Sequence, residues 1–158
     1  MAKIVSAWDG YYADLLRDFK ASDAKASWFE YQMNKRYNAF PEILDFIPSN
    51  IQDKLILEIG SGLGQDAITM IKRGSRLTTV DISSSACELT KLHLAIHNMK
   101  AEILNINAEI LPFNRGSFDV IYSFGVFMHT LNPQAIIDQS YTTLKQGGTL
   151  RVMIYNRL

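Results

Sequence analysis

Three glycines at alternate positions form the most informative segment of this sequence. The segment Glu58–Gly64, which reads Glu-Ile-Gly-Ser-Gly-Leu-Gly, directly follows a short apolar run at 55–59 and directly precedes an amphipathic stretch. Glycines allow the backbone to turn sharply and to approach a ligand closely, and the N–H groups at the start of a helix present a positive end to it. The segment therefore predicts a ligand-binding loop between a strand and a helix, rather than an ordinary glycine turn.

The spacing of the glycines and the acid before them narrow the type of ligand. The fingerprint of dinucleotide sites requires a further glycine where Gln65 stands in this sequence. The Glu58 carboxylate would repel a pyrophosphate, whereas it suits a ligand that carries an ammonium group. We therefore expect a cofactor with a cationic part to bind at Glu58, Gly60, Ser61, Gly62 and Gly64.

A second acid stands at the end of the next apolar run. Asp81 closes the predicted strand 77–81, about 20 residues beyond the first glycine, where nucleotide-binding α/β folds place the acid that accepts hydrogen bonds from ribose hydroxyls. Asp81 could instead cap the following helix, because the run Asp81-Ile82-Ser83-Ser84 is rich in capping residues. We favour the ligand role, which implies a cofactor that contains adenosine.

Alternating elements would hold these loops in position. Beyond residue 50, short apolar runs alternate with longer amphipathic stretches, which is typical of an α/β fold with a mostly parallel sheet, here of about five strands. We expect strands at 55–59, 77–81, 101–104, 120–122 and 149–155, and helices at 65–73, 84–97 and 133–144. We also expect a loop at 104–118, and an interruption of regular structure at Gly147-Gly148. Residues 1–50 predict two or three helices, which would form an N-terminal cap on a domain of residues 51–158.

Four ordered segments resemble the class I S-adenosylmethionine-dependent methyltransferases, in particular those that act on small molecules. The four are the acid-glycine loop, Val80-Asp81-Ile82, the stretch 107–119, and 144–150 with its glycine pair. The resemblance implies a Rossmann-like fold that binds S-adenosylmethionine and releases S-adenosylhomocysteine. It also implies that the glycine loop contacts the methionine part, that Asp81 with Ile82 beside it holds the ribose, and that Asn107, Ala108 and Glu109 frame adenine. Asn107 stands where the family often has Asp, so this contact with adenine would carry no charge.

The segment after the fourth predicted strand is expected to face the methyl acceptor. Ligands of open parallel sheets lie beyond the carboxyl ends of the strands, which places Ser123, Phe124 and His129 at the rim between cofactor and acceptor. His129 is the candidate catalytic residue, a general base for a hydroxyl acceptor, because imidazole exchanges protons near neutral pH. The alternative is that His129 packs against or caps its loop. This segment lacks an Asn-Pro-Pro-Tyr or Asp-Pro-Pro-Tyr motif, which argues against methylation of DNA adenine.

Other residues with chemical potential have simpler explanations. His93 and His97 stand four apart on a predicted helix, but without a third ligand nearby they predict a solvent-facing pair and no metal site. Cys87 is expected to be a small buried packing residue. Aromatic side chains near the N-terminus could either line an acceptor pocket or pack the helices, and three of them are the pocket candidates: Tyr11, Tyr12 and Tyr31.

Composition excludes several partners. The 16 basic and 16 acidic side chains balance, so no net charge attracts a nucleic acid. No apolar stretch has the length of a signal peptide or of a membrane span. The single cysteine gives no disulfide, and we expect a cytoplasmic protein.

The end of the sequence raises a question about assembly. The family normally adds two strands and a helix after the fifth strand, and their absence would leave 149–155 as an uncovered apolar edge. We expect a homodimer or completion of the sheet by another chain, unless the N-terminal helices cover the edge. The function is then either an active methyltransferase with a small-molecule acceptor, or a truncated or inactive cofactor-binding module that works through association. A nucleotide-dependent oxidoreductase is a third alternative.

Overall fold

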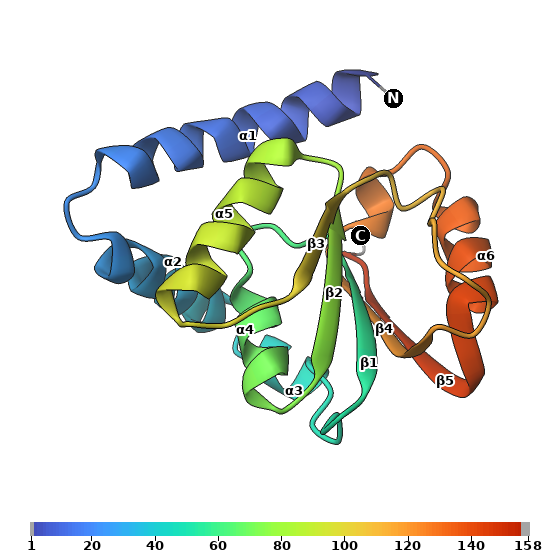
Figure 1. Cartoon of the computed structure of the whole chain (residues 1–158). Helices are drawn as coiled ribbons and strands as arrows, with labels where there is room; N and C mark the ends of the chain where they lie inside the picture. The colour runs from blue at the N-terminus through green and yellow to red at the C-terminus, as the bar shows by residue number, and fades with distance from the viewer. Residues whose placement is uncertain (1, 156–158) are drawn as a thin grey trace.

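Five parallel strands form the centre of the computed structural model, which describes residues 2–155 (Figure 1). They are β1 (Leu55–Ile59), β2 (Arg76–Asp81), β3 (Glu102–Asn105), β4 (Phe118–Phe124) and β5 (Leu144–Met153). The strand order is β3-β2-β1-β4-β5, and all neighbouring pairs are parallel. The predicted Rossmann-like α/β fold is confirmed. Because the strand order reverses between β1 and β4, the carboxyl ends of these strands are the expected place for a ligand.

Helices cover both faces of the sheet. They are α1 (Ala2–Ala21), α2 (Lys25–Ala39), α3 (Ile43–Phe46), α4 (Gln65–Lys72), α5 (Ser84–Ile96) and α6 (Pro133–Thr143), with a 3₁₀ turn, η1, at Phe127–His129. Figure 1 shows α4 and α5 on one face of the sheet, α6 on the other, and α1 lying across α5. None of the helices in residues 2–155 combines the length and apolar character needed to cross a membrane.

The core divides according to the alternation of side chains along the strands. Successive strand residues point to opposite faces, so Ile56 of β1 joins a cluster with α3 and α4, whereas Leu57 joins a cluster with η1 and α6. A third cluster joins the N-terminal helices to α5 through Leu16, Phe19, Phe29, Leu63 and Leu89. Leu63 belongs to the glycine loop, so the N-terminal helices pack directly against that loop.

The fifth strand differs from the prediction. It begins at Leu144, immediately after α6, and continues through the glycine pair that was expected to interrupt regular structure. Gly147 has a φ of +76°, and the register with β4 shifts between Phe118 and Val120. Glycine adopts this backbone conformation without strain, so the pair forms an irregularity within the strand instead of ending it.

Candidate cofactor-binding site

A cavity of about 700 Å³ opens at the carboxyl ends of β1, β2 and β4. This volume lies within the range of about 300–1,000 Å³ that is typical of small-molecule sites. Most of the predicted site residues line it: Glu58, Gly60, Ser61, Gly62, Asp81, Ile82, Asn107, Ala108, Glu109, Phe124 and His129. The structure therefore brings residues from four separate chain segments into one cavity.

The glycine loop depends on glycine at each of its three positions. Gly60, Gly62 and Gly64 have φ angles of +90°, +53° and +73°, which other residues rarely adopt. A side chain would also collide with neighbours, because a Cβ atom on Gly60 would lie 2.3 Å from a methyl carbon of Val126. The loop thus turns sharply between β1 and α4, as its sequence predicts.

Two predicted residues, Gly64 and Ser123, do not line the cavity. Gly64 is the N-cap residue of α4 and faces Thr90 of α5, where a Cβ atom would lie 3.0 Å from the Thr90 methyl. Ser123 is buried within β4 and its hydroxyl donates a hydrogen bond to the Ile59 carbonyl at 3.0 Å. Both residues shape the wall from behind, because their contacts are directed away from the cavity.

Asp81 connects the second strand to the glycine loop. Its Oδ2 accepts a hydrogen bond from the Gly62 N–H at 3.1 Å, and its Oδ1 accepts one from the Ser83 N–H at 2.9 Å. The N-cap of α5 is Ser83, whose hydroxyl accepts from the Ala86 N–H, so the capping alternative for Asp81 is wrong. Burial raises the pKa of Asp81 despite these hydrogen bonds. Further donors, such as ribose hydroxyls, would stabilise its charged form.

Glu58 is a buried carboxyl group at the end of β1. Its Oε2 accepts a hydrogen bond from the Thr79 hydroxyl at 2.7 Å. Burial raises the pKa of Glu58 well above its ordinary value, and the nearby charge of Asp66 adds to this effect. An ammonium group in the cavity would oppose both effects, because an opposite charge favours the ionised carboxylate.

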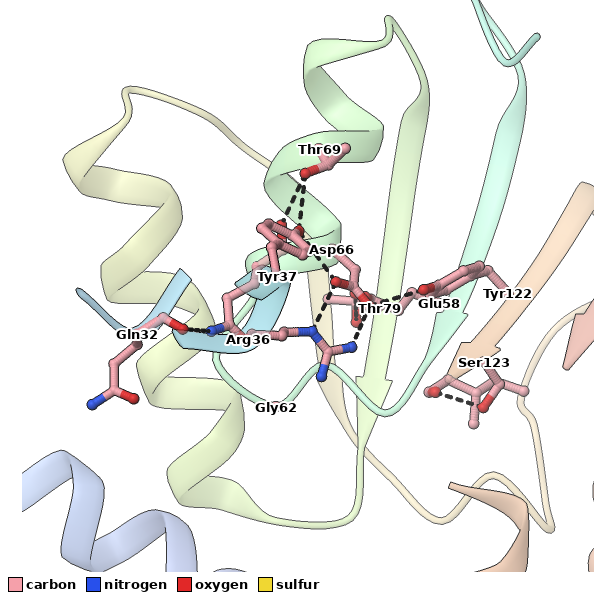
Figure 2. Close-up of polar contacts among 12 residues, drawn as sticks. Gln32, Arg36, Tyr37, Glu58, Gly62, Asp66, Thr69, Thr79, Tyr122 and Ser123 are labelled. Atoms are coloured by element: carbon pink, nitrogen blue, oxygen red, sulfur yellow. Dashed lines mark hydrogen bonds and ion pairs between the residues drawn. The ribbon is translucent and has the colours of Figure 1, made fainter. Parts of the chain in front are cut away.

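An ion pair that the sequence did not reveal forms another part of the wall. Arg36 of α2 makes two hydrogen bonds to Asp66 of α4, Nη2 to Oδ2 at 2.7 Å and Nε to Oδ1 at 3.1 Å (Figure 2). The Tyr122 and Tyr37 hydroxyls donate to the same carboxylate at 2.9 Å and 3.2 Å. Both Arg36 and Asp66 line the cavity. This pairing joins segments 30 residues apart, so no local motif predicts it.

Comparison with known proteins decides the family. A family model described as a methyltransferase domain matches residues 57–152. The chain belongs to this methyltransferase family. The match begins in β1 and ends in β5, so it includes part or all of every strand, and together with the fold it places the chain in the class I S-adenosylmethionine-dependent methyltransferase family.

Curated relatives of this methyltransferase include two ubiquinone biosynthesis O-methyltransferases. The one from Nitrosomonas europaea is 26% identical and aligns with 94% of this chain and 66% of its own length. The one from Dechloromonas aromatica is 29% identical and aligns with 74% of this chain and 52% of its own length. The chain therefore spans about half to two thirds of the length of these relatives.

Solved structures share the fold. The [4+2]-cyclase SpnF superposes with a TM-score of 0.68 at 18% identity, over 84% of this chain and 48% of the cyclase. Geranyl diphosphate C-methyltransferase from Streptomyces coelicolor, solved with S-adenosyl-L-homocysteine, superposes with a TM-score of 0.64 at 17% identity, over 82% of this chain and 51% of that enzyme. At such identities the likeness establishes the architecture alone.

The wall of the cavity fits S-adenosylmethionine, the cofactor of this methyltransferase family. The buried Glu58 carboxyl suits the ammonium group of the methionine part, and the Asp81 carboxyl suits the ribose hydroxyls. The glycine loop between them lines the cavity, which puts its backbone within reach of a ligand. The cavity thus offers carboxyl groups that suit the ammonium group and the ribose of the cofactor.

Glu109 links the predicted adenine loop to the segment that follows His129. Its Oε1 accepts hydrogen bonds from the backbone N–H groups of Leu131 at 3.2 Å and Asn132 at 3.1 Å. The side chain of Asn107 accepts a hydrogen bond from the Glu109 N–H at 3.0 Å, which shapes the loop locally. Glu109 therefore supports the segment after His129 as well as bordering the cavity.

Aromatic side chains of α1 border the same side. The Trp8 ring meets the His129 ring edge to face, with centroids 4.9 Å apart. Of the three pocket candidates, Tyr11 and Tyr12 line the cavity, whereas Tyr31 does not line it and is largely exposed. His129 is itself exposed and lines the cavity, so solvent and a ligand in the cavity can both reach it.

Two further predictions need correction. His93 does not face solvent: it is completely buried, because α2 packs over it and the Phe29 ring stacks on its imidazole. Cys87 is only partly buried, with its thiol 3.8 Å from the Asp81 carbonyl oxygen. Within residues 2–155, no cluster of His, Cys, Asp and Glu side chains has the arrangement of a metal site.

Proposed function

We propose that this protein transfers a methyl group from S-adenosylmethionine to a small-molecule acceptor. The observation that carries the proposal is the single cavity in which Glu58, the glycine loop and Asp81 meet. The names of the ubiquinone biosynthesis relatives support a small organic acceptor over a nucleic acid. We further infer a cytoplasmic location from the single cysteine, which gives no disulfide within the sequence.

Each part of the cofactor has a proposed partner. The methionine ammonium lies at Glu58, and its carboxylate lies at Arg36, because only two of the five guanidinium N–H donors bond to Asp66. The ribose hydroxyls bond to Asp81. Adenine lies beside Ile82 and between the residues of the 107–109 loop.

Calorimetry tests this assignment directly. S-adenosylhomocysteine should bind the purified chain and raise its melting temperature, because ligands stabilise the state that they bind. NAD at the same concentration should do neither, since its pyrophosphate would meet the acid beside the glycine loop. Absence of heat and of stabilisation with S-adenosylhomocysteine at millimolar concentration would reject the proposal, and binding of NAD instead would favour an oxidoreductase.

The protein would act mainly by positioning the reactants. The cofactor supplies an activated methyl group, so little side-chain chemistry is required for its in-line displacement. Trp8, Tyr11 and Phe124 offer ring surfaces against which a flat acceptor could pack. His129 lies beside Trp8 and would take the proton from an acceptor hydroxyl as the new bond forms.

His129→Ala is expected to slow methyl transfer about a hundredfold, because it removes the general base. Single-turnover rates measured with a hydroxyl acceptor give this comparison, while S-adenosylhomocysteine affinity should stay within about threefold. Tyr31→Phe, a change on the exposed surface of α2 outside the cavity, is the control. A rate within a few-fold of the wild type would instead assign His129 to packing against Trp8.

We also propose that the protein forms a homodimer through the β5 edge. Among residues 2–155, β5 pairs only with β4, and its other edge presents backbone groups that can pair with another strand. One face of β5 is partly covered, because Arg151 donates a hydrogen bond to the Phe46 carbonyl at the end of α3. The exposed Ile154 and Tyr155 continue beyond the strand. The alternative function, an inactive cofactor-binding module that works through association, would use the same edge.

Ile154→Lys is expected to convert a dimer to a monomer in light scattering across a range of concentrations. It is a cleaner test than Val152→Lys, since Val152 packs against the core. Tyr31→Lys is the matched control, because Tyr31 and Ile154 are both 61% exposed and Tyr31 lies on α2. A wild-type monomer at every concentration would reject the dimer, and cover of the edge by α1 is already excluded because α1 lies across α5.

A further inference from the structure

His93 is a fully buried histidine in the last turn of α5. Its Nδ1 lies 2.7 Å from the carbonyl oxygen of Leu63, the residue between the second and third loop glycines. Its Nε2 is buried and has no hydrogen-bond partner among the residues that the structure describes. Only the tautomer with hydrogen on Nδ1 satisfies the Leu63 carbonyl without burying an unpaired N–H group.

The surroundings keep this imidazole neutral. Burial lowers the pKa of His93 to about 4, although the hydrogen bond to Leu63 acts in the opposite direction. The titratable groups that face it are His97 on α5 and Lys72 on α4, and both disfavour a positive charge. His93 is therefore a neutral hydrogen-bond donor at physiological pH.

Two side chains of α5 hold consecutive carbonyls of the glycine loop. The Thr90 hydroxyl donates to the Gly62 carbonyl at 3.2 Å, and His93 donates to the Leu63 carbonyl. Residues three apart lie on the same face of a helix, so Thr90 and His93 reach the loop together. The C=O and N–H groups of a trans peptide point in opposite directions. Holding the Gly62 carbonyl against α5 thus turns the Leu63 N–H away from α5, and Leu63 lines the cavity.

A face of the His93 ring packs against helix α2. The Phe29 ring is parallel to the imidazole within 2°, with centroids 4.0 Å apart. One turn further along α2, the Gln32 carbonyl accepts a hydrogen bond from the Gln65 side chain at 2.8 Å, and the next turn carries Arg36 (Figure 2). The imidazole therefore lies between the glycine loop and the helix that supplies the cavity with a guanidinium group.

We propose that His93 is a positioning residue for the cofactor, which holds the glycine loop in its binding conformation and sets its distance from α2. The proposal builds on S-adenosylmethionine as the ligand of the cavity. The hydrogen bond from the Nδ1–H of His93 is required for this role. A residue of equal volume without a hydrogen-bond donor would not perform it.

Two substitutions separate the hydrogen bond from the packing. His93→Leu removes the donor, whereas the amide of His93→Asn can place an N–H group close to the position of Nδ1. Both lose the stacking on Phe29, so both should lower the melting temperature. S-adenosylhomocysteine affinity, measured by calorimetry, should fall about tenfold in His93→Leu and stay within about threefold in His93→Asn, because one buried hydrogen bond separates them.

Two further measurements complete the test. Leu94→Val, in the core on the same helix, should lower the melting temperature and leave the affinity unchanged. Amide hydrogen exchange at Gly62, Leu63 and Gly64 in the ligand-free protein should be faster in His93→Leu than in His93→Asn. Wild-type affinity in His93→Leu, or equal losses in both His93 variants, would overturn the proposal. Failure of the wild type to bind would instead reject the cofactor assignment, while the exchange rates would still decide whether His93 holds the loop.

Discussion

Asp81→Ala is expected to weaken S-adenosylhomocysteine binding about thirtyfold or more. Two charge-assisted hydrogen bonds to the ribose would be lost, at a cost of about 2 kcal/mol. The same change frees the Gly62 N–H and the Ser61 hydroxyl, which the carboxylate holds at 3.1 Å and 3.5 Å. Loosening of the glycine loop would therefore add to the loss. Calorimetry with the wild type and the variant measures the change in Kd.

Ser83→Ala provides the control for the Asp81 prediction. Ser83 is the N-cap of α5, and its loss should destabilise the fold by about 1 kcal/mol. It should leave the affinity within about twofold, because its hydroxyl bonds to Ala86 and Asp9 and does not line the cavity. If Asp81→Ala lowers the melting temperature but retains the affinity, the carboxylate supports the loop without contacting the ribose.

Local patterns predicted the sheet and the residues that follow its strands. The glycine loop, Asp81 and the 107–109 loop each depend on a few consecutive residues and their position after a strand. Alternation of strands and helices predicts a parallel sheet, and the observed order β3-β2-β1-β4-β5 brings the carboxyl ends of β1, β2 and β4 together. The cofactor half of the cavity was predictable for this reason.

Contacts between distant segments were not predictable from the same patterns. Arg36 finds Asp66 because α2 packs beside α4, and His93 is buried because Phe29 covers it. In both cases the partner lies on another helix at least 30 residues away in the sequence, and periodicity alone does not specify the pairing. Ser123 was predicted to lie at the rim of the site from its position at the end of a strand. Alternation of side chains along β4 instead directs its hydroxyl to the Ile59 carbonyl and away from the cavity.

These distant contacts make α2 part of the cofactor cavity. At three successive turns the helix is joined to α5 through Phe29 and to α4 through Gln32 and Arg36. The sequence indicates only an amphipathic helix for α2. In the structure this helix supplies a charged group, the Arg36 guanidinium, beside Glu58. The two carboxyls differ in their partners, since Asp66 is paired with the Arg36 guanidinium, whereas Glu58 is proposed to meet the cationic part of the ligand.

Arg36→Met is expected to have the largest effect on stability and to weaken S-adenosylhomocysteine binding at least tenfold. The Asp66 side chain is only 6% exposed, so removing its partner would leave a buried charge held by two tyrosine hydroxyls, at a cost of about 2 kcal/mol or more. Arg17→Met is the matched control, because Arg17 pairs with Asp14 where the side chains are 74% and 71% exposed. Its loss should change the free energy of unfolding by less than about 1 kcal/mol.

The double variant Arg36→Met/Asp66→Asn distinguishes support of the fold from contact with the cofactor. Removing both charges should recover most of the stability in chemical denaturation, because no unpaired buried charge remains. The affinity should not recover, since the guanidinium that meets the methionine carboxylate is still missing. Recovery of both the stability and the affinity would mean that Arg36 acts only by neutralising Asp66. The carboxylate of the cofactor would then need another partner, and the candidate is the neighbouring Lys35, an exposed cation in the cavity wall.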